Sequence, residues 1–95
     1  MSMTPAQEEI LRITQEECGE VVQIISKCCR FGIDNEHLKA GEINRKLLAE
    51  ELGDLLCMID LAMEFRIVDV EDIRNAQVGK RKKLKEWSTI FEEAK

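Results

Sequence analysis

The sequence predicts an all-α fold, a small helical bundle of three main helices plus a short connector helix, completed by oligomerisation. Two observations predict it. The 95 residues are 44% hydrophobic and 35% charged, with one proline, five glycines and no tyrosine, which is typical of helical proteins. Apolar residues also recur at helical spacing in three long segments, each preceded by a capping residue. The length predicts a single domain over residues 1–95.

The first helix is predicted from Pro5 to about Arg30. Thr4 can cap it, Pro5 suits the first helical position, and Gln7 completes a capping box. Gly32 follows the last apolar residue and can adopt the left-handed conformation that closes a helix. This helix is therefore defined by sequence signals at both ends.

The sequence after Gly32 predicts a short connector helix and two further long helices. Residues 35–39 have weak helical character and form the connector. Asn44 is expected to cap a second long helix that runs to about Phe65. Asp69 then caps a third, which extends to about Glu86.

One ten-residue pattern occurs twice, at residues 16–25 and 50–59. Each copy reads Glu-Glu-x-Gly-acid followed by apolar residues. On a helical wheel the first Glu of each copy points outward, the second lies inside the apolar arc, and the final acid lies at its edge. The four carboxylates on the apolar side are Glu17, Glu20, Glu51 and Asp54. Isolated acidic residues of this kind usually lie on solvated surfaces, but no Lys or Arg in either arc neutralises these.

Four converging carboxylates favour a divalent cation, because they otherwise repel one another. A set of oxygen ligands without Cys or His suits Mg²⁺, with Mn²⁺ as a possible substitute, and not zinc or copper. The lone histidine, His37, lies in the connector, which argues against a di-iron site.

Charge and cysteine content exclude other classes. The net charge of −5 argues against binding a nucleic acid polymer, and no apolar run approaches the length of a membrane span. The four cysteines, two of them adjacent, do not resemble a disulfide framework. We expect small buried thiols in a reducing cytoplasm, and the polar, acidic N-terminus does not resemble a signal peptide.

The two acidic motifs resemble those of the all-α MazG-like nucleoside triphosphate pyrophosphohydrolases, whose signature is Glu-Glu-x-x-Glu followed by Glu-x-x-Asp. The matching segments are 16–20 and 51–54. The similarity continues through residues 27–32, Asn44 and the late basic run, so it covers about residues 5 to 88. It looks closest to short single-domain members of phages and bacteria.

The resemblance implies hydrolysis of a (d)NTP between its α and β phosphates, giving a (d)NMP and pyrophosphate. By analogy, the four inward carboxylates bind Mg²⁺, and Glu16 orients or deprotonates the attacking water or is only a solvated neighbour. Phosphates also need cations from the protein. Lys80 and Lys83 match the late basic positions of the family, and Lys27, two turns beyond Glu20, is a further candidate.

The apolar arcs are broad for so short a chain, which predicts a homodimer or homotetramer with the site near the interface. Two other functions remain open from the sequence. One is a non-catalytic regulator that binds metal or nucleotide. The other is a helical interaction module whose acidic residues pair with basic residues of a partner.

Overall fold

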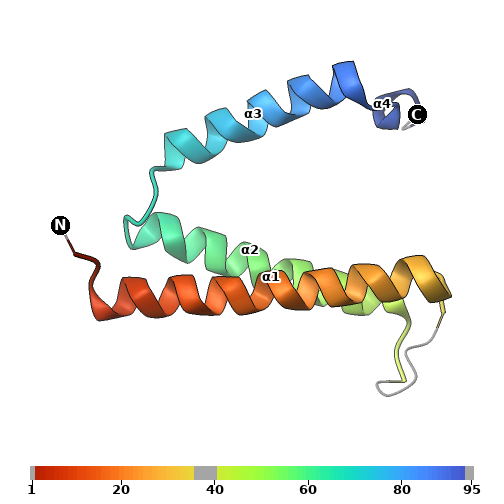
Figure 1. Ribbon diagram of the computed structural model, residues 1–95, viewed down its shortest axis with the longest axis horizontal. Helices are drawn as coiled ribbons and strands as arrows, with labels where there is room; N and C mark the ends of the chain where they lie inside the picture. Colours follow the sequence, from red (N-terminus) through yellow and green to blue (C-terminus); the bar gives the residue numbers. More distant parts are fainter. Residues whose placement is uncertain (1, 36–40, 94–95) are drawn as a thin grey trace.

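The computed structural model describes residues 2–35 and 41–93. It contains three main helices, α1 (Pro5–Phe31), α2 (Asn44–Glu64) and α3 (Val70–Trp87), and a short helix α4 (Ile90–Glu93) (Figure 1). The all-α class is confirmed, and each main helix begins and ends within about one residue of its predicted bounds. The predicted connector helix at 35–39 lies almost wholly outside the described residues.

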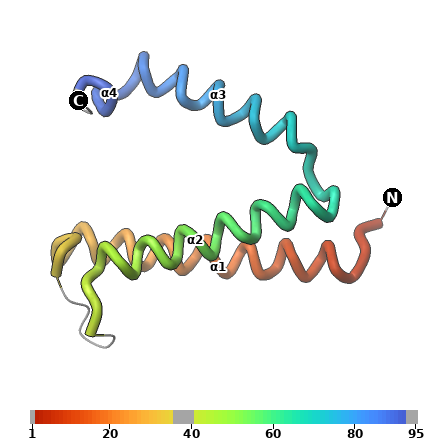
Figure 2. Tube along the Cα trace, turned by 180° about the vertical axis from the view of Figure 1, so that it is seen from behind, coloured from red at the N-terminus to blue at the C-terminus, as the bar shows by residue number. Residues whose placement is uncertain are grey.

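Helices α1 and α2 lie side by side and antiparallel (Figures 1 and 2). One end of their contact is a small apolar core of Ile10, Met58 and Ala62, against which Ile67 packs. Further along α1, Val21 and Ile24 are also buried, while other apolar side chains of the pair, such as Val22 and Leu56, stay exposed. Removal of the buried side chains from water stabilises the pair.

Hydrogen bonds join the two helices at each end. At one end Gln7, which also completes the predicted capping box with Thr4, donates from Nε2 to the carbonyl of Phe65 at 2.8 Å. At the other end the Asn44 amide donates from Nδ2 to the carbonyl of Gly32 at 2.9 Å. These bonds hold the register of α1 against α2.

The prediction that Asn44 caps α2 is wrong. Ile43 occupies the capping position, and no side chain caps the helix there. Asn44 is instead the first helical residue, 1% exposed, and its amide is used for the bond to Gly32. Gly32 has the positive φ of 99° that favours glycine, but its ψ of 142° is extended and not left-handed helical.

Helix α2 ends in a Schellman motif built on a non-glycine residue. The amide of Arg66 donates to the carbonyl of Met63 at 3.0 Å, and that of Ile67 donates to Ala62 at 2.9 Å. Arg66 has a φ of 59°, in the left-handed region. Because Ile67 packs on the core, this turn fixes the direction in which the chain leaves α2.

Replacing Arg66 with Gly should stabilise the fold by about 1 kcal/mol, because the left-handed conformation of a residue with a Cβ costs about that much. Urea denaturation measures the change. The control is Arg66→Ala, which removes the guanidinium but keeps the Cβ, and should stay within about 0.5 kcal/mol of the wild type. A loss of stability in the glycine variant, or an equal gain in both variants, would contradict this reading of the turn.

Helix α3 diverges from the α1–α2 pair (Figures 1 and 2). None of its residues is buried. The radius of gyration is 16.3 Å, against about 12 Å for a compact chain of this length. The extents of 46 × 38 × 16 Å describe a slab little thicker than one helix with its side chains. The expected bundle therefore does not close within one chain.

The open arrangement also explains the cysteines. All four described cysteines are free, as predicted, but they are not the buried thiols that the sequence suggested. Cys18, Cys29 and Cys57 are exposed, and Cys28 is half-buried. Cys18, for example, lies on α1 next to half-buried Glu17 and is exposed, because a single partner helix covers only part of α1.

Candidate metal site

Helices α1 and α2 bring three carboxylates together midway along their contact. One oxygen from each of Glu17, Glu51 and Asp54 lies within 4.8 Å of the others. Glu17 and Glu51 are half-buried, whereas Asp54 is exposed. The cluster thus lies at the edge of the helix contact, with one side open to solvent.

Helical periodicity explains why these three side chains project towards the contact between α1 and α2. Glu51 and Asp54 are three residues apart, so they project from the same side of α2. Glu17 lies on α1 between buried Ile10 and buried Val21, on the side that faces α2. The same apolar packing that joins the helices therefore brings the three carboxylates together.

Glu51 lies in an environment that disfavours its negative charge. The pKa of Glu51 lies above its ordinary value, first because burial removes water from the carboxylate and then because neighbouring carboxylates repel its charge. These neighbours are, in decreasing order of effect, Glu20, Asp54, Glu17 and Glu50. Within the described part of the chain, none of the three clustered carboxylates forms an ion pair.

The cluster fits a hard divalent cation. Carboxylate oxygens are the ligands that Mg²⁺ and Mn²⁺ prefer, and Mg²⁺ is usually held by one or two carboxylates plus substrate phosphates. A cation would also offset the repulsion that, after burial, raises the pKa of Glu51.

Two other acidic residues of the predicted site lie nearby on α1. Glu20 is exposed and lies outside the three-carboxylate cluster, although its charge is the largest of those that raise the pKa of Glu51. Glu16 is exposed, as its outward position on the wheel suggested. Glu50, expected to face water, also contributes to the repulsion at Glu51.

The predicted phosphate-binding lysines are not gathered at this cluster. Lys27 is half-buried on α1, two turns beyond Glu20. Lys80 and Lys83 lie on α3, which diverges from the pair that carries the carboxylates (Figure 1). The chain therefore assembles the acidic part of the site without these two lysines.

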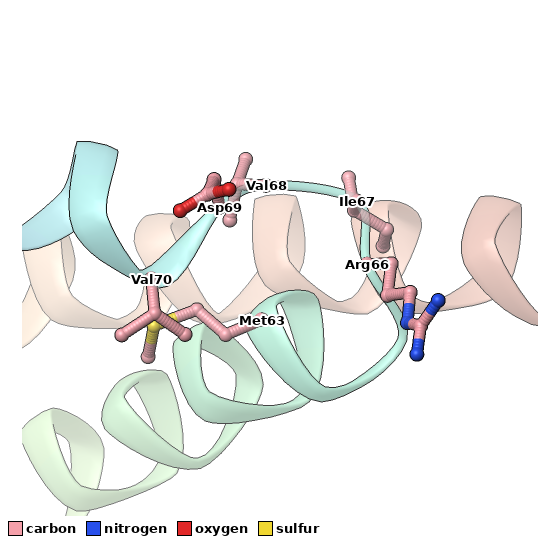
Figure 3. Close-up of a pocket in the computed structure, with 6 residues that line it drawn as sticks. All are labelled: Met63, Arg66, Ile67, Val68, Asp69 and Val70. Atoms are coloured by element: carbon pink, nitrogen blue, oxygen red, sulfur yellow. The ribbon is translucent and has the colours of Figure 1, made fainter.

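A separate cavity lies where α2 turns into α3, a region without any predicted functional residue. Its volume is about 430 Å³, and its lining includes Met63, Arg66, Asp69 and Val70 (Figure 3). No motif marked it in the sequence, because it follows from the direction of α3. It lies at the end of α2, more than two helical turns from Glu51 along the chain.

The fold and the carboxylate cluster define an all-α protein with a candidate site for a divalent cation. The chain belongs to the MazG nucleotide pyrophosphohydrolase domain family, whose model matches residues 6–86. Members of this family typically hydrolyse nucleoside triphosphates and generally depend on divalent metal ions. No curated protein and no solved structure matches the chain. Among the described helices, none is both long and apolar enough to cross a membrane.

Proposed function

We propose that this protein is a Mg²⁺-dependent nucleoside triphosphate pyrophosphohydrolase that cleaves a (d)NTP to a (d)NMP and pyrophosphate. The observation that carries the proposal is the convergence of Glu17, Glu51 and Asp54, which form no ion pair with any basic residue of the described ranges 2–35 and 41–93. Family membership supplies the reaction class. Mn²⁺ is a possible substitute for Mg²⁺.

In this proposal the clustered carboxylates hold the cation. Glu20, exposed and outside the cluster but three residues after Glu17 on α1, is proposed as a fourth ligand. When bound, Mg²⁺ would neutralise charge on the phosphate oxygens and lower the pKa of water. The three carboxylates would hold the cation at the edge of the helix contact, where Asp54 is exposed to solvent.

The chemical step adds water across the α–β phosphoanhydride. The water oxygen forms a bond to one of the two phosphorus atoms while the bond from that atom to the bridging oxygen breaks. The electron pair of the broken bond leaves on the bridging oxygen, with pyrophosphate if the α phosphorus is attacked and with the monophosphate if the β phosphorus is attacked. Glu16, exposed beside Glu17, orients the water or accepts its proton. Lys80, Lys83 and Lys27 are the proposed cationic contacts to the phosphates.

The open shape supports the expected homodimer or homotetramer, because one chain leaves large apolar side chains uncovered. The substrate is a free nucleotide and not a nucleic acid polymer, in keeping with the net charge of −5. The cytoplasmic location expected from the cysteines stays a prediction.

A substrate panel tests the function. Purified protein is incubated with each canonical NTP and dNTP, with Mg²⁺ or with EDTA, and the products are separated by ion-exchange chromatography. We expect a monophosphate and pyrophosphate in equal amounts, only with the metal. A diphosphate and inorganic phosphate would contradict the cleavage position. No turnover with any nucleotide, combined with stabilisation by Mg²⁺, would favour the non-catalytic regulator.

A further inference from the structure

Five apolar side chains of α1 lie directly beside its contact with α2. Each follows a residue on the contact side of the helix, as exposed Val22 follows buried Val21 and exposed Ile25 follows buried Ile24. One residue turns a helix by about 100°, so these side chains form a stripe next to the contact. The stripe consists of Leu11, Cys18, Val22, Ile25 and Cys29, all of them exposed.

Helix α2 has a matching stripe. Exposed Leu52 follows half-buried Glu51, and half-buried Ile59 follows buried Met58. On antiparallel helices viewed along one axis, a step of one residue turns clockwise on one helix and counter-clockwise on the other, so both stripes lie on the same side of the pair. This second stripe consists of Leu52, Leu56, Ile59 and Met63. We call the nine residues of the two stripes the apolar flank.

The two sides of the α1–α2 pair differ in charge. None of the nine residues of the apolar flank is charged. Glu20 and Asp54, three residues after Glu17 and Glu51, are turned the other way by about 60° and are exposed on the opposite side. That acidic side would repel an identical surface, whereas the apolar flank could meet its own copy without burying a charge.

The size and shape of the apolar flank fit a second helix pair. Helix α2 has 21 residues. The flank is therefore about 30 Å long and, with two helices side by side, about 20 Å wide, comparable to the ~800 Å² that each partner buries in a stable interface. A single helix would cover only the groove between the stripes. The α1–α2 pair of a second copy offers two stripes of the same length and apolar character.

We propose that the apolar flank packs against the apolar flank of a second copy about a two-fold axis, so that the two helix pairs lie face to face. The contact is isologous, because the same nine residues serve both copies. The acidic cluster of each copy is then left open to solvent on the far side of its helix pair. The contact is independent of the proposed hydrolysis, and its tests use no nucleotide.

The cysteines provide a footprint of this contact in the wild-type protein. Cys18 lies on the apolar flank, whereas Cys57 follows Leu56 and is exposed on the outer side of α2. The protein is treated briefly with N-ethylmaleimide over a range of protein concentrations, and mass spectrometry measures the modification of each cysteine. At high concentration Cys18 should react several-fold more slowly than Cys57, and dilution should remove the difference.

A charge placed on the apolar flank should separate the copies. Val22 and Leu56 are 67% and 60% exposed in the single chain, so Val22→Glu and Leu56→Glu should keep the helical circular dichroism spectrum. In the proposed contact the new carboxylate would be buried and would face its own counterpart across the two-fold axis. Sedimentation velocity should show a dimer or larger assembly for the wild type and a single chain for both variants. The control Cys57→Glu adds the same charge on the outer side of α2 and should keep the wild-type mass.

Equal reactivity of Cys18 and Cys57 at every concentration would overturn the proposal. A wild-type mass for both folded flank variants would also overturn it, since the copies would then meet through another surface. A wild type that is a single chain at all concentrations would contradict the second copy as the occupant of the flank. None of these results depends on whether the protein hydrolyses nucleotides, so a failure of the proposed function is a separate outcome.

Discussion

Replacing Glu51 with Gln should lower nucleotide hydrolysis by about a hundredfold or more, the usual effect of removing one group that stabilises the transition-state charge. Glu51 lies among the other clustered carboxylates, and its pKa is raised by burial and by their charges. The amide keeps the shape of the side chain but removes the negative charge that holds a cation. Steady-state kinetics with a substrate from the nucleotide panel measures the loss.

The matched control is Glu64→Gln, which makes the same change at an exposed position on the same helix. It should retain the wild-type rate. The Glu51→Gln variant should also be at least as stable as the wild type without metal, because it removes a carboxylate whose ionised form is disfavoured. Normal hydrolysis by Glu51→Gln would remove this residue from the proposed ligand set.

Mg²⁺ should raise the melting temperature markedly. A ligand at about a hundred times its Kd stabilises the native state by about 2.7 kcal/mol. For a domain of this size each kcal/mol corresponds to about 4–8 °C. We therefore expect a rise of roughly 10–20 °C near saturation, measured by differential scanning fluorimetry at fixed protein concentration. The Glu51→Gln variant should show a much smaller rise.

The effect of Mg²⁺ should increase with pH. The pKa of Glu51 is raised in the folded protein, so its contribution to stability is fully present below the unfolded pKa and is lost as pH rises through the folded pKa. Protons and Mg²⁺ compete for the same carboxylates, so the shift should be small near about pH 4 and larger near about pH 8. A shift that is equal at both values, or equal in the Glu51→Gln variant, would contradict binding at this cluster.

The helices were predictable because their signals are local. The capping box of Thr4 and Gln7, the Asp69 cap and the apolar periodicity all act within a few residues, and the structure contains each of them. Asn44 was misassigned because its amide bonds to Gly32, a partner twelve residues away that no local pattern reveals. The direction of α3 was also not predictable, since it depends on the left-handed Arg66 and on the packing of Ile67.

In the candidate site, too, some features follow from local sequence patterns and others depend on tertiary contacts. The convergence of Glu17, Glu51 and Asp54 follows from two amphipathic helices packing antiparallel, which the sequence predicts. Whether Glu20 joins them depends on the helix rotation, and the structure leaves it outside the cluster. The separation of Lys80 from the carboxylates depends on tertiary geometry, which no motif encodes.

The most direct test of the metal site is a Mn²⁺ titration followed by electron paramagnetic resonance, which detects the free ion. Wild-type protein and the Glu64→Gln control should remove Mn²⁺ from solution equally, and added Mg²⁺ should release it. The Glu51→Gln variant should leave the Mn²⁺ free under the same conditions. Equal Mn²⁺ uptake by all three proteins would contradict the claim that the carboxylates between α1 and α2 hold the catalytic cation.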